Sequence, residues 1–209
     1  RDTQEVLSAA EMKVFKIAEG GRRGRADFVP LREAMKEAFQ LLQERYENQG
    51  SVTGLPTGFH DFDEMTAGLQ NSDLIILAAR PAMGKTTLAL NMAEYAALKT
   101  KKAVAVYSME MSASQLAFRL ISSIGRINAT RLRTGQLEDE DWARVNMAIK
   151  MLSEVKIFID DTPALSPDVL RSKARRIKRE HDLGLIVIDY LQLMTVPGTG
   201  ENRATEISE

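Results

Sequence analysis

The chain has 209 residues, with 28 Lys and Arg against 29 Asp and Glu, two His and no Cys. A length of this order is typical of one domain with an additional segment, and it is sufficient to bury a hydrophobic core. The lack of Cys excludes disulfides, thiolate metal sites and cysteine nucleophiles. The near-neutral charge balance excludes a polycationic nucleic-acid coat but not a local basic groove. No apolar run approaches the roughly 20 residues of a membrane-spanning helix, and no signal-peptide pattern opens the sequence.

Two amphipathic helices are predicted in the first fifty residues. Apolar residues recur at three- and four-residue spacing from Val6 to Ile17, and two glycines at 20 and 21 would end this helix. A basic connector follows at residues 22–25, and a second helix begins after Pro30. Its apolar stripe consists of Leu31, Met35, Ala38, Leu42 and Tyr46. The two helices cannot bury both stripes unaided, so they need either the following domain or another subunit.

From Val52 onward, short apolar runs alternate with helical windows. The predicted strands are residues 74–78, 103–107, 156–159 and 185–188. The predicted helices are residues 86–98, 113–123, 140–152 and 167–180, two of which begin with recognisable caps at Ser112 and Ser166. Uniformly apolar runs are typical of parallel strands that are covered on both faces. The alternation therefore predicts an α/β fold with a mainly parallel sheet.

Residues 79–86, with the sequence ARPAMGKT, lie directly between a predicted strand and a predicted helix. This is the setting of a phosphate-binding loop, in which backbone N–H groups and a helix N-terminus attract anions. Gly84 permits close approach of the backbone, Lys85 would reach the β- and γ-phosphates, and the Thr86 hydroxyl would coordinate Mg²⁺. The first position of the usual motif is Ala79 instead of Gly. The alternative is an ordinary helix start with a solvated lysine.

Two carboxylates are expected at the same edge of the sheet as this loop. Asp189 directly follows the last predicted strand, at the edge of the sheet where ligands of open α/β sheets bind, and we expect it to support the Mg²⁺ shell. Glu110 follows the second predicted strand by three residues and is the best candidate for orienting a water molecule. The alternatives are a strand-end turn residue and a solvated loop glutamate. Asp160 and Asp161 are rivals, but they precede a Thr-Pro pair and are interpreted as a turn.

Five segments, taken in order, resemble the DnaB family of bacterial replicative DNA helicases, which are RecA-like P-loop motors. The segments are VTGLPTGFHDFDEMTAGL (52–69), ARPAMGKTT (79–87), YSMEMS (107–112), RTGQLEDEDW (133–142) and LIVIDYLQLM (185–194). The resemblance covers nearly the whole chain, and the alanine at position 79 also belongs to this family's version of the loop. RecA-type recombinases and RadA proteins share the core but usually keep the first glycine, so a DNA-dependent ATPase of that kind is the alternative.

The resemblance implies an ATP site with Mg²⁺. It assigns phosphate and metal contacts to Lys85 and Thr86, support of the metal shell to Asp189, and polarisation of the attacking water to Glu110. The residues expected to line the nucleotide are Ala82, Gly84, Lys85, Thr86, Thr87 and Arg119. Arg119 is equally well interpreted as a solvated helix arginine.

The resemblance also implies an organisation and partners. Residues 1–20 are similar to the last helix of an N-terminal domain that faces primase, residues 21–50 to a linker whose helix (31–48) packs on a neighbouring subunit, and residues 51–209 to the motor. Such proteins form hexamers around single-stranded DNA at replication forks in the bacterial cytoplasm, and primase and a helicase loader are further partners. We expect Asn202 and Arg203, in a glycine-rich loop at residues 194–203, to contact DNA phosphates. An ordinary surface loop would have the same composition.

The motor is expected to be incomplete at its C-terminus. In this family a strand with a γ-phosphate-sensing glutamine and then an arginine finger come later than Glu209, and the strand lies between the P-loop strand and the Asp189 strand. The chain begins with Arg1, so we also expect its start to be processed, engineered or cut from a longer protein. Two hypotheses remain open: an ATP-driven helicase, and a truncated assembly fragment that does not hydrolyse ATP.

Overall fold

The computed structural model describes residues 29–47 and 52–195, which belong to two units divided at Gly50 and Ser51. The first unit contains helix α2 (Leu31–Glu47), which confirms the helix predicted after Pro30. Its apolar side chains are exposed, among them Leu31, Met35 and Leu42. The helix predicted within residues 1–20, the connector at 21–25 and the DNA-contacting Asn202 and Arg203 lie outside the described residues.

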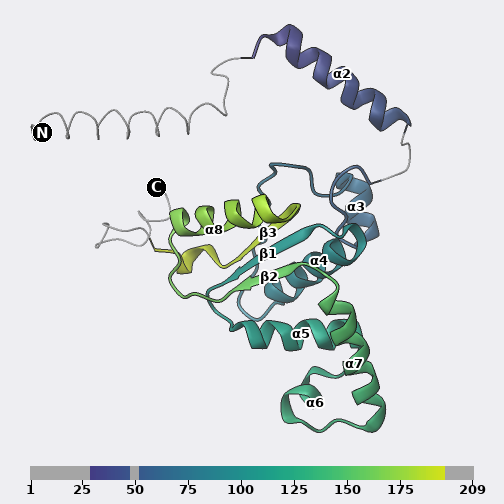
Figure 1. Ribbon diagram of the computed structural model, residues 1–209, viewed down its shortest axis with the longest axis vertical. Helices are drawn as coiled ribbons and strands as arrows, with labels where there is room; N and C mark the ends of the chain where they lie inside the picture. The colour runs from purple at the N-terminus through teal and green to yellow at the C-terminus, as the bar shows by residue number, and fades with distance from the viewer. Residues whose placement is uncertain (1–28, 48–51, 196–209) are drawn as a thin grey trace, which may run out of the picture. The chain divides into compact units, whose positions relative to one another are not determined.

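The second unit is built on a parallel sheet of three described strands, in the order β2-β1-β3 (Figure 1). The strands are β1 (Ala103–Ser108), β2 (Ile157–Asp160) and β3 (Leu183–Asp189). Val104 is paired with Ile157 on one side and Leu185 on the other. All six residues of β1 are buried, which is why this run is apolar along most of its length. The α/β class and three of the four predicted strands are confirmed.

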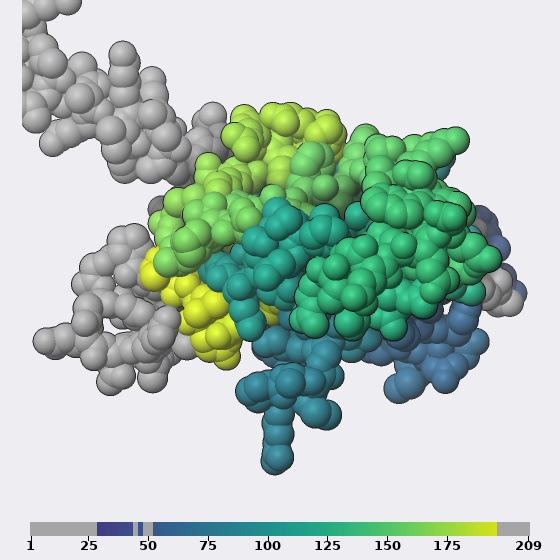
Figure 2. All heavy atoms as spheres, turned by 90° about the horizontal axis from the view of Figure 1, so that it is seen from below, coloured from purple at the N-terminus to yellow at the C-terminus, as the bar shows by residue number. Residues whose placement is uncertain are grey.

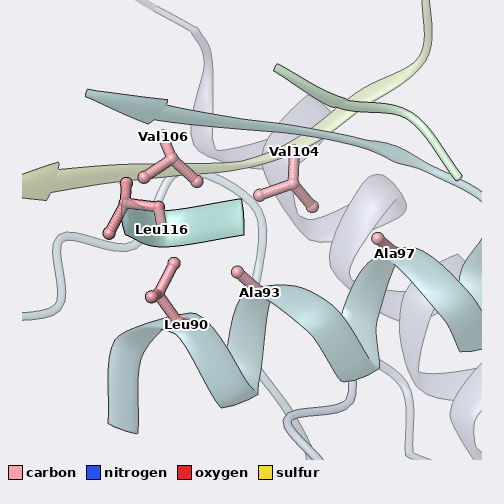
Figure 3. Packing of buried hydrophobic residues seen from close by; sticks show 6 residues of the cluster. All are labelled: Leu90, Ala93, Ala97, Val104, Val106 and Leu116. Atoms are coloured by element: carbon pink, nitrogen blue, oxygen red, sulfur yellow. The ribbon is translucent and has the colours of Figure 1, made fainter. Parts of the chain in front are cut away.

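Helices cover both faces of this sheet. Helix α8 (Pro167–Glu180) lies on one face, while α4 (Lys85–Thr100) and α5 (Ala113–Gly125) lie on the other (Figure 1). Figure 3 shows the core on the α4 side, which comprises Leu90, Ala93, Ala97, Val104, Val106 and Leu116. On the α8 side, Ala105 and Tyr107 of β1 pack with Leu165 and are flanked by Leu170 and Ile177. Alternate residues of β1 thus serve two cores, as the two-residue period of a strand requires.

The helix caps explain where several of these helices begin. Ser112 and Gln115 form a reciprocal capping box on α5, and Ser166 accepts a hydrogen bond from Val169 N at the start of α8, where Pro167 occupies the first turn. Two short helices were not predicted: α3 (His60–Thr66) and α6 (Ala129–Thr134). A single 3₁₀ turn, Leu191–Leu193, follows β3.

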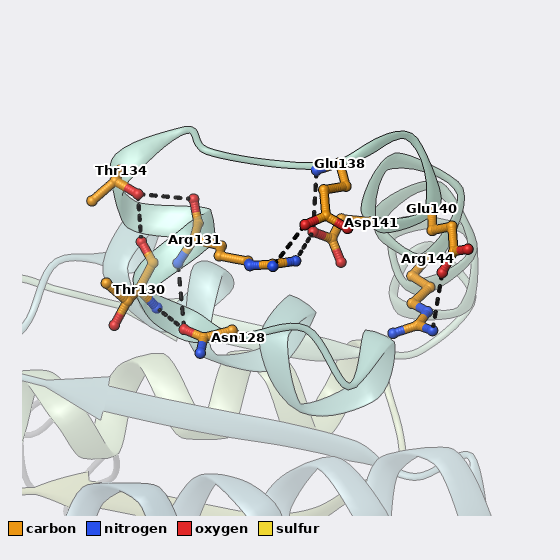
Figure 4. A network of polar contacts seen from close by, with 8 residues as sticks. All are labelled: Asn128, Thr130, Arg131, Thr134, Glu138, Glu140, Asp141 and Arg144. Carbon is orange, nitrogen blue, oxygen red and sulfur yellow. Dashed lines mark hydrogen bonds and ion pairs between the residues drawn. The ribbon is translucent and has the colours of Figure 1, made fainter.

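Helix α6 is joined to α7 (Asp139–Ser153) by a polar network centred on Arg131 (Figure 4). The Arg131 guanidinium donates to Glu138 Oε1 at 2.7 Å and to Asp141 Oδ2 at 3.1 Å. Asp141 also accepts a hydrogen bond from Glu138 N, and this bond together with Arg131 holds the pKa of the Asp141 carboxyl below its usual value although burial opposes the shift. Helices α5, α6 and α7 form the side of the second unit that faces the viewer in Figure 2.

The prediction of a strand at residues 74–78 is wrong. These residues adopt no strand in the structure, and their side chains are exposed, with Leu74 at 87% and Ile76 at 79%. An apolar sequence becomes a strand only where a neighbouring strand can satisfy its backbone N–H and C=O groups. Among the described residues β3 pairs with β1 alone, and no described strand pairs with residues 74–78. None of the helices within the described ranges is long and apolar enough to cross a membrane.

Candidate nucleotide-binding site

The predicted phosphate loop leads directly into α4. Gly84 is the N-cap of this helix and has φ of +87°, a conformation that favours glycine even though a Cβ there would meet no atom within 4 Å. Lys85 and Thr86 form the first turn, where backbone N–H groups have no partner within the helix and attract anions. Ala82, with φ of +63°, lies in the bend that precedes the glycine.

The core packing of α4 brings its first turn to the carboxyl end of β3. Asp189 is the last residue of that strand, pairs in register with Ser108 of β1, and is 5% exposed. Thr86 Oγ1 donates a hydrogen bond of 2.6 Å to Asp189 Oδ2, although the two residues are 103 positions apart. Lys85 Nζ is 4.0 Å from Asp189 Oδ1 and 4.5 Å from the centre of the Tyr190 ring. The structure therefore brings together Lys85, Thr86 and Asp189 as expected.

These groups fit Mg²⁺ and a phosphate chain. Hydroxyl and carboxylate oxygens are the ligands that Mg²⁺ prefers, and a helix N-terminus with a lysine is a phosphate site. Thr86 and Asp189 also line a small hollow between α4 and the sheet. It is lined by Thr86, Ala89, Leu90, Val106, Ser108, Leu116, Val187 and Asp189.

Arg119 lies beside the same turn of α4. Its Nη1 donates to Thr87 Oγ1 at 3.0 Å, which connects α5 to α4 next to the phosphate loop. Both side chains are accessible to solvent, so the arginine is available to a ligand held at the loop. The hydrogen bond distinguishes Arg119 from the other exposed helix arginines, which the sequence could not do.

Glu110 lies just beyond β1, at the edge of the sheet where Asp189 ends β3. The backbone on both sides of Glu110 is fixed: Met109 N donates to Asp189 O at 2.9 Å, and Ser108 Oγ donates to Met111 O at 2.8 Å. The Glu110 side chain is exposed and forms no hydrogen bond or ion pair with any residue that the structure describes. The anchoring by Ser108 and Met109 was not predicted from the sequence.

Of the two rival carboxylates, Asp160 serves the predicted turn, whereas Asp161 contacts the start of α5. Asp160 accepts hydrogen bonds from Thr162 N and Oγ1 at 3.1 and 2.6 Å, and it pairs with Lys173 at 2.6 Å. Burial raises the pKa of Asp160, but the hydrogen bonds from Lys173 and Thr162 outweigh burial and place that pKa below its usual value. Asp161 Oδ2 accepts from Ala113 N, the first residue of α5.

One buried polar contact near α4 was missed. Thr57 donates from both its backbone N and its hydroxyl to the carboxylate of Asp63, at 2.8–3.0 Å, and Gly58 N adds a third donor at 3.1 Å. Thr57 is 1% exposed and Asp63 is 5% exposed. Gly58 lies against Tyr95 of α4. The sequence TGFHDFD (57–63) offers little sign of this arrangement, because the donors precede α3 in an irregular segment and the acceptor lies on that short helix.

The parallel sheet and the phosphate loop at the start of α4 place the second unit in the RecA-like P-loop class. A family profile described as "DnaB-like helicase C terminal domain" matches residues 54–209. The chain belongs to the DnaB-like helicase C-terminal domain family. This membership speaks against the RecA- or RadA-like alternative.

Similar proteins agree with this assignment. The chain is 43% identical, over its full length, to a replicative DNA helicase DnaC of Bacillus subtilis (strain 168), and 44% identical, over 98% of its length, to a replicative DNA helicase DnaB of Geobacillus stearothermophilus. It covers 46% and 45% of these two proteins, so it spans less than half the length of such relatives.

Two solved structures are similar in fold. One is described as an ATPase domain, with a TM-score of 0.80, 32% identity, and coverage of 87% of this chain and 64% of that one. The other is described as a DnaB-like replicative helicase and its interactions with primase, with a TM-score of 0.74, 31% identity, and coverage of 98% and 53%.

Proposed function

We propose that this chain is part of an ATP-dependent replicative DNA helicase, which translocates as a hexameric ring on single-stranded DNA and unwinds the duplex at the replication fork. The observation that carries the proposal is the hydrogen bond from Thr86 to Asp189 beside Lys85, at the N-terminus of α4. The relatives named replicative DNA helicase supply the rest. Such a protein acts in the bacterial cytoplasm, where the chromosome lies.

Each residue of the site has a role that its position supports. Lys85 neutralises the β- and γ-phosphates of ATP, and the Thr86 hydroxyl binds Mg²⁺, with Asp189 supporting its shell. When bound, Mg²⁺ neutralises charge on the phosphate oxygens during transfer. Glu110 orients the attacking water, because its backbone is fixed beside Asp189 while its carboxylate remains open to a ligand. Ala82, Gly84, Thr87 and Arg119 line the nucleotide.

ATP hydrolysis by the 209-residue chain, with and without single-stranded DNA, tests this proposal. We expect DNA-stimulated hydrolysis that disappears in Lys85→Ala and persists in Lys99→Ala, which removes an exposed lysine of the same helix. Equal loss in both variants, or hydrolysis that survives Lys85→Ala, would contradict the assigned site. Binding of a fluorescent ATP analogue without turnover would support the second candidate, an assembly fragment that does not hydrolyse ATP.

The hexamer is proposed to form through α2. Its exposed apolar residues, including Leu31, Met35 and Leu42, lie on a helix whose charged residues are mostly off the stripe, and such a surface is stabilised by packing on a partner. We expect Leu42→Asp to weaken ring assembly, measured by light scattering, while Gln43→Asp on the polar side leaves it unchanged. An unchanged hexamer in Leu42→Asp would refute this assembly surface.

The remaining partners follow from the family. Single-stranded DNA is proposed to contact Asn202 and Arg203 through its phosphates. Primase and a helicase loader are proposed as protein partners, and the description of one similar structure includes interactions with primase.

A further inference from the structure

Helix α8 has an uneven charge distribution. It contains six basic residues and only two acidic ones, in a chain whose formal net charge is −1. Its apolar residues Leu170, Ala174 and Ile177 face the sheet. The six basic residues are Arg171, Lys173, Arg175, Arg176, Lys178 and Arg179.

Three of these six already have a place in the fold. Lys173 pairs with Asp160, and Lys178 pairs with Asp182 at 3.2 Å and also donates to Leu183 O. Arg176 lines a hollow against β1 and β2, on the flank of the helix that also holds Lys173. These contacts account for half of the basic residues of α8 within the fold.

The other three are Arg171, Arg175 and Arg179, which we call the arginine stripe. All three are exposed, and within the described parts of the chain none of them forms an ion pair or a side-chain hydrogen bond. They are spaced four residues apart, so they follow one side of the helix with a rise of about 6 Å between successive members.

A solvated face does not require this arrangement. Basic residues four apart repel each other, whereas a face that serves only solubility intersperses both signs of charge. Arginine is also the residue best suited to bidentate contacts with phosphate oxygens. A row of regularly spaced guanidinium groups therefore matches a regular row of phosphates.

The start of α8 lies beside the segment that leads into the predicted DNA loop. Thr195 Oγ1 donates to Ala164 O at 2.7 Å, and Thr195 N donates to Leu165 O at 3.3 Å, just before α8 begins at Pro167. A strand of DNA held by the loop at residues 194–203 would thus pass near Arg171. This step rests on the proposed function, and it favours DNA over an acidic protein as the partner.

We infer that the arginine stripe of α8 is a second DNA-binding surface, which holds the phosphate backbone of a DNA strand without sequence preference. Binding at this surface requires neither ATP nor turnover. It extends the contact made at Asn202 and Arg203.

Fluorescence anisotropy of a labelled oligo-dT, measured with the 209-residue chain over a range of salt concentrations, tests the inference. The triple variant Arg171→Gln, Arg175→Gln, Arg179→Gln is expected to bind the oligonucleotide at least about tenfold more weakly at low salt. The slope of log K against log salt should become shallower by about 2, because each of the three lost phosphate contacts on a single strand contributes about 0.7. The matched control, Lys99→Gln, Arg133→Gln, Lys150→Gln, removes the same charge from exposed positions elsewhere. Circular dichroism checks that both variants remain folded.

Several results would overturn the inference. The affinity and the salt slope could be unchanged in the stripe variant, or the control variant could lose as much affinity as the stripe variant does. A poly-glutamate peptide that binds as tightly as DNA would instead indicate an acidic protein partner. Arg→Lys replacements at the three positions should retain the salt slope. Lys85→Ala separates the two proposals, because it should abolish hydrolysis and leave the binding by the stripe unchanged. DNA-stimulated hydrolysis together with an unaltered stripe variant would leave the helicase proposal standing and refute the second surface.

Discussion

Replacement of Asp63 by Ala should destabilise the second unit more than its position on a seven-residue helix would suggest. The carboxylate accepts hydrogen bonds from Thr57 N, Thr57 Oγ1 and Gly58 N. A buried donor left without a partner costs about 1–3 kcal/mol. Gly58 N is only partly buried and can bind water, but Thr57 is 1% exposed. The two donors of Thr57 therefore predict a loss of about 2–6 kcal/mol in the free energy of unfolding.

Urea unfolding at neutral pH, followed by circular dichroism, measures this loss. The control is Asp61→Ala, which removes an exposed aspartate from the same helix and should cost less than about 1 kcal/mol through the helix dipole. In a Thr57→Val background, which removes the hydroxyl donor, Asp63→Ala should cost less than it does alone. Equal effects of Asp63→Ala and Asp61→Ala would refute the reasoning, because they would show that the buried donors find other partners.

Two further predictions concern the same unit. Gly58→Ala should lower the free energy of unfolding by about 2 kcal/mol, because φ is +87° and the new Cβ would lie 2.6 Å from Tyr95 Cγ. The control is Gly135→Ala, which has φ of +72° and open space and should show only the smaller backbone strain of about 1 kcal/mol. Similar urea midpoints for the two variants would contradict the clash with Tyr95. Lys173→Met should lower stability by about 1 kcal/mol at pH 7, because Asp160 is then ionised and has lost its partner. The pKa of Asp160 is lowered in the folded protein, so the stabilisation by this ion pair is present above the unfolded pKa of about 3.9 and is lost as the pH falls through the folded pKa. The stabilities of the wild-type protein and Lys173→Met should therefore converge in acid. A stability difference that persists in acid would exclude the ion pair as the cause of the destabilisation.

The parallel strands and long helices were predictable because each carries its own signal. The runs at 103–107 and 185–188 are apolar throughout, and the structure extends them only to Ser108 and from Leu183 to Asp189. Helix α6 was missed because six residues are too few for an apolar period, although Asn128 and Gly135 were available as its caps. The run at 74–78 has as strong a strand signal as the others, yet it forms no strand, because pairing depends on a neighbour that its own residues do not specify.

The site followed from the sequence where a general rule of the fold applies. Parallel strands bring their carboxyl ends to one edge, so Asp189 and the start of α4 were expected to meet, and Thr86 does donate to Asp189. Contacts that depend on side-chain geometry could not be derived in this way. The hydrogen bond of Arg119 to Thr87, the turn made by Ser108 and Met111, and the position of Lys85 over the Tyr190 ring all depend on packing.

The two halves of the nucleotide site are supported differently. Leu90, Ala93 and Ala97 pack α4 against β1, and β1 in turn fixes Asp189, so the half proposed to hold the metal is set by the buried core. The half proposed to hold the phosphates, residues 79–83, follows the exposed run at 74–78, and no described strand pairs with that run. A phosphate loop binds best when its N–H groups are fixed before the ligand arrives. A segment that pairs with residues 74–78 should therefore strengthen nucleotide binding without touching the nucleotide. If this chain binds the nucleotide weakly, we expect the cause to lie in the phosphate loop and not in Thr86 or Asp189.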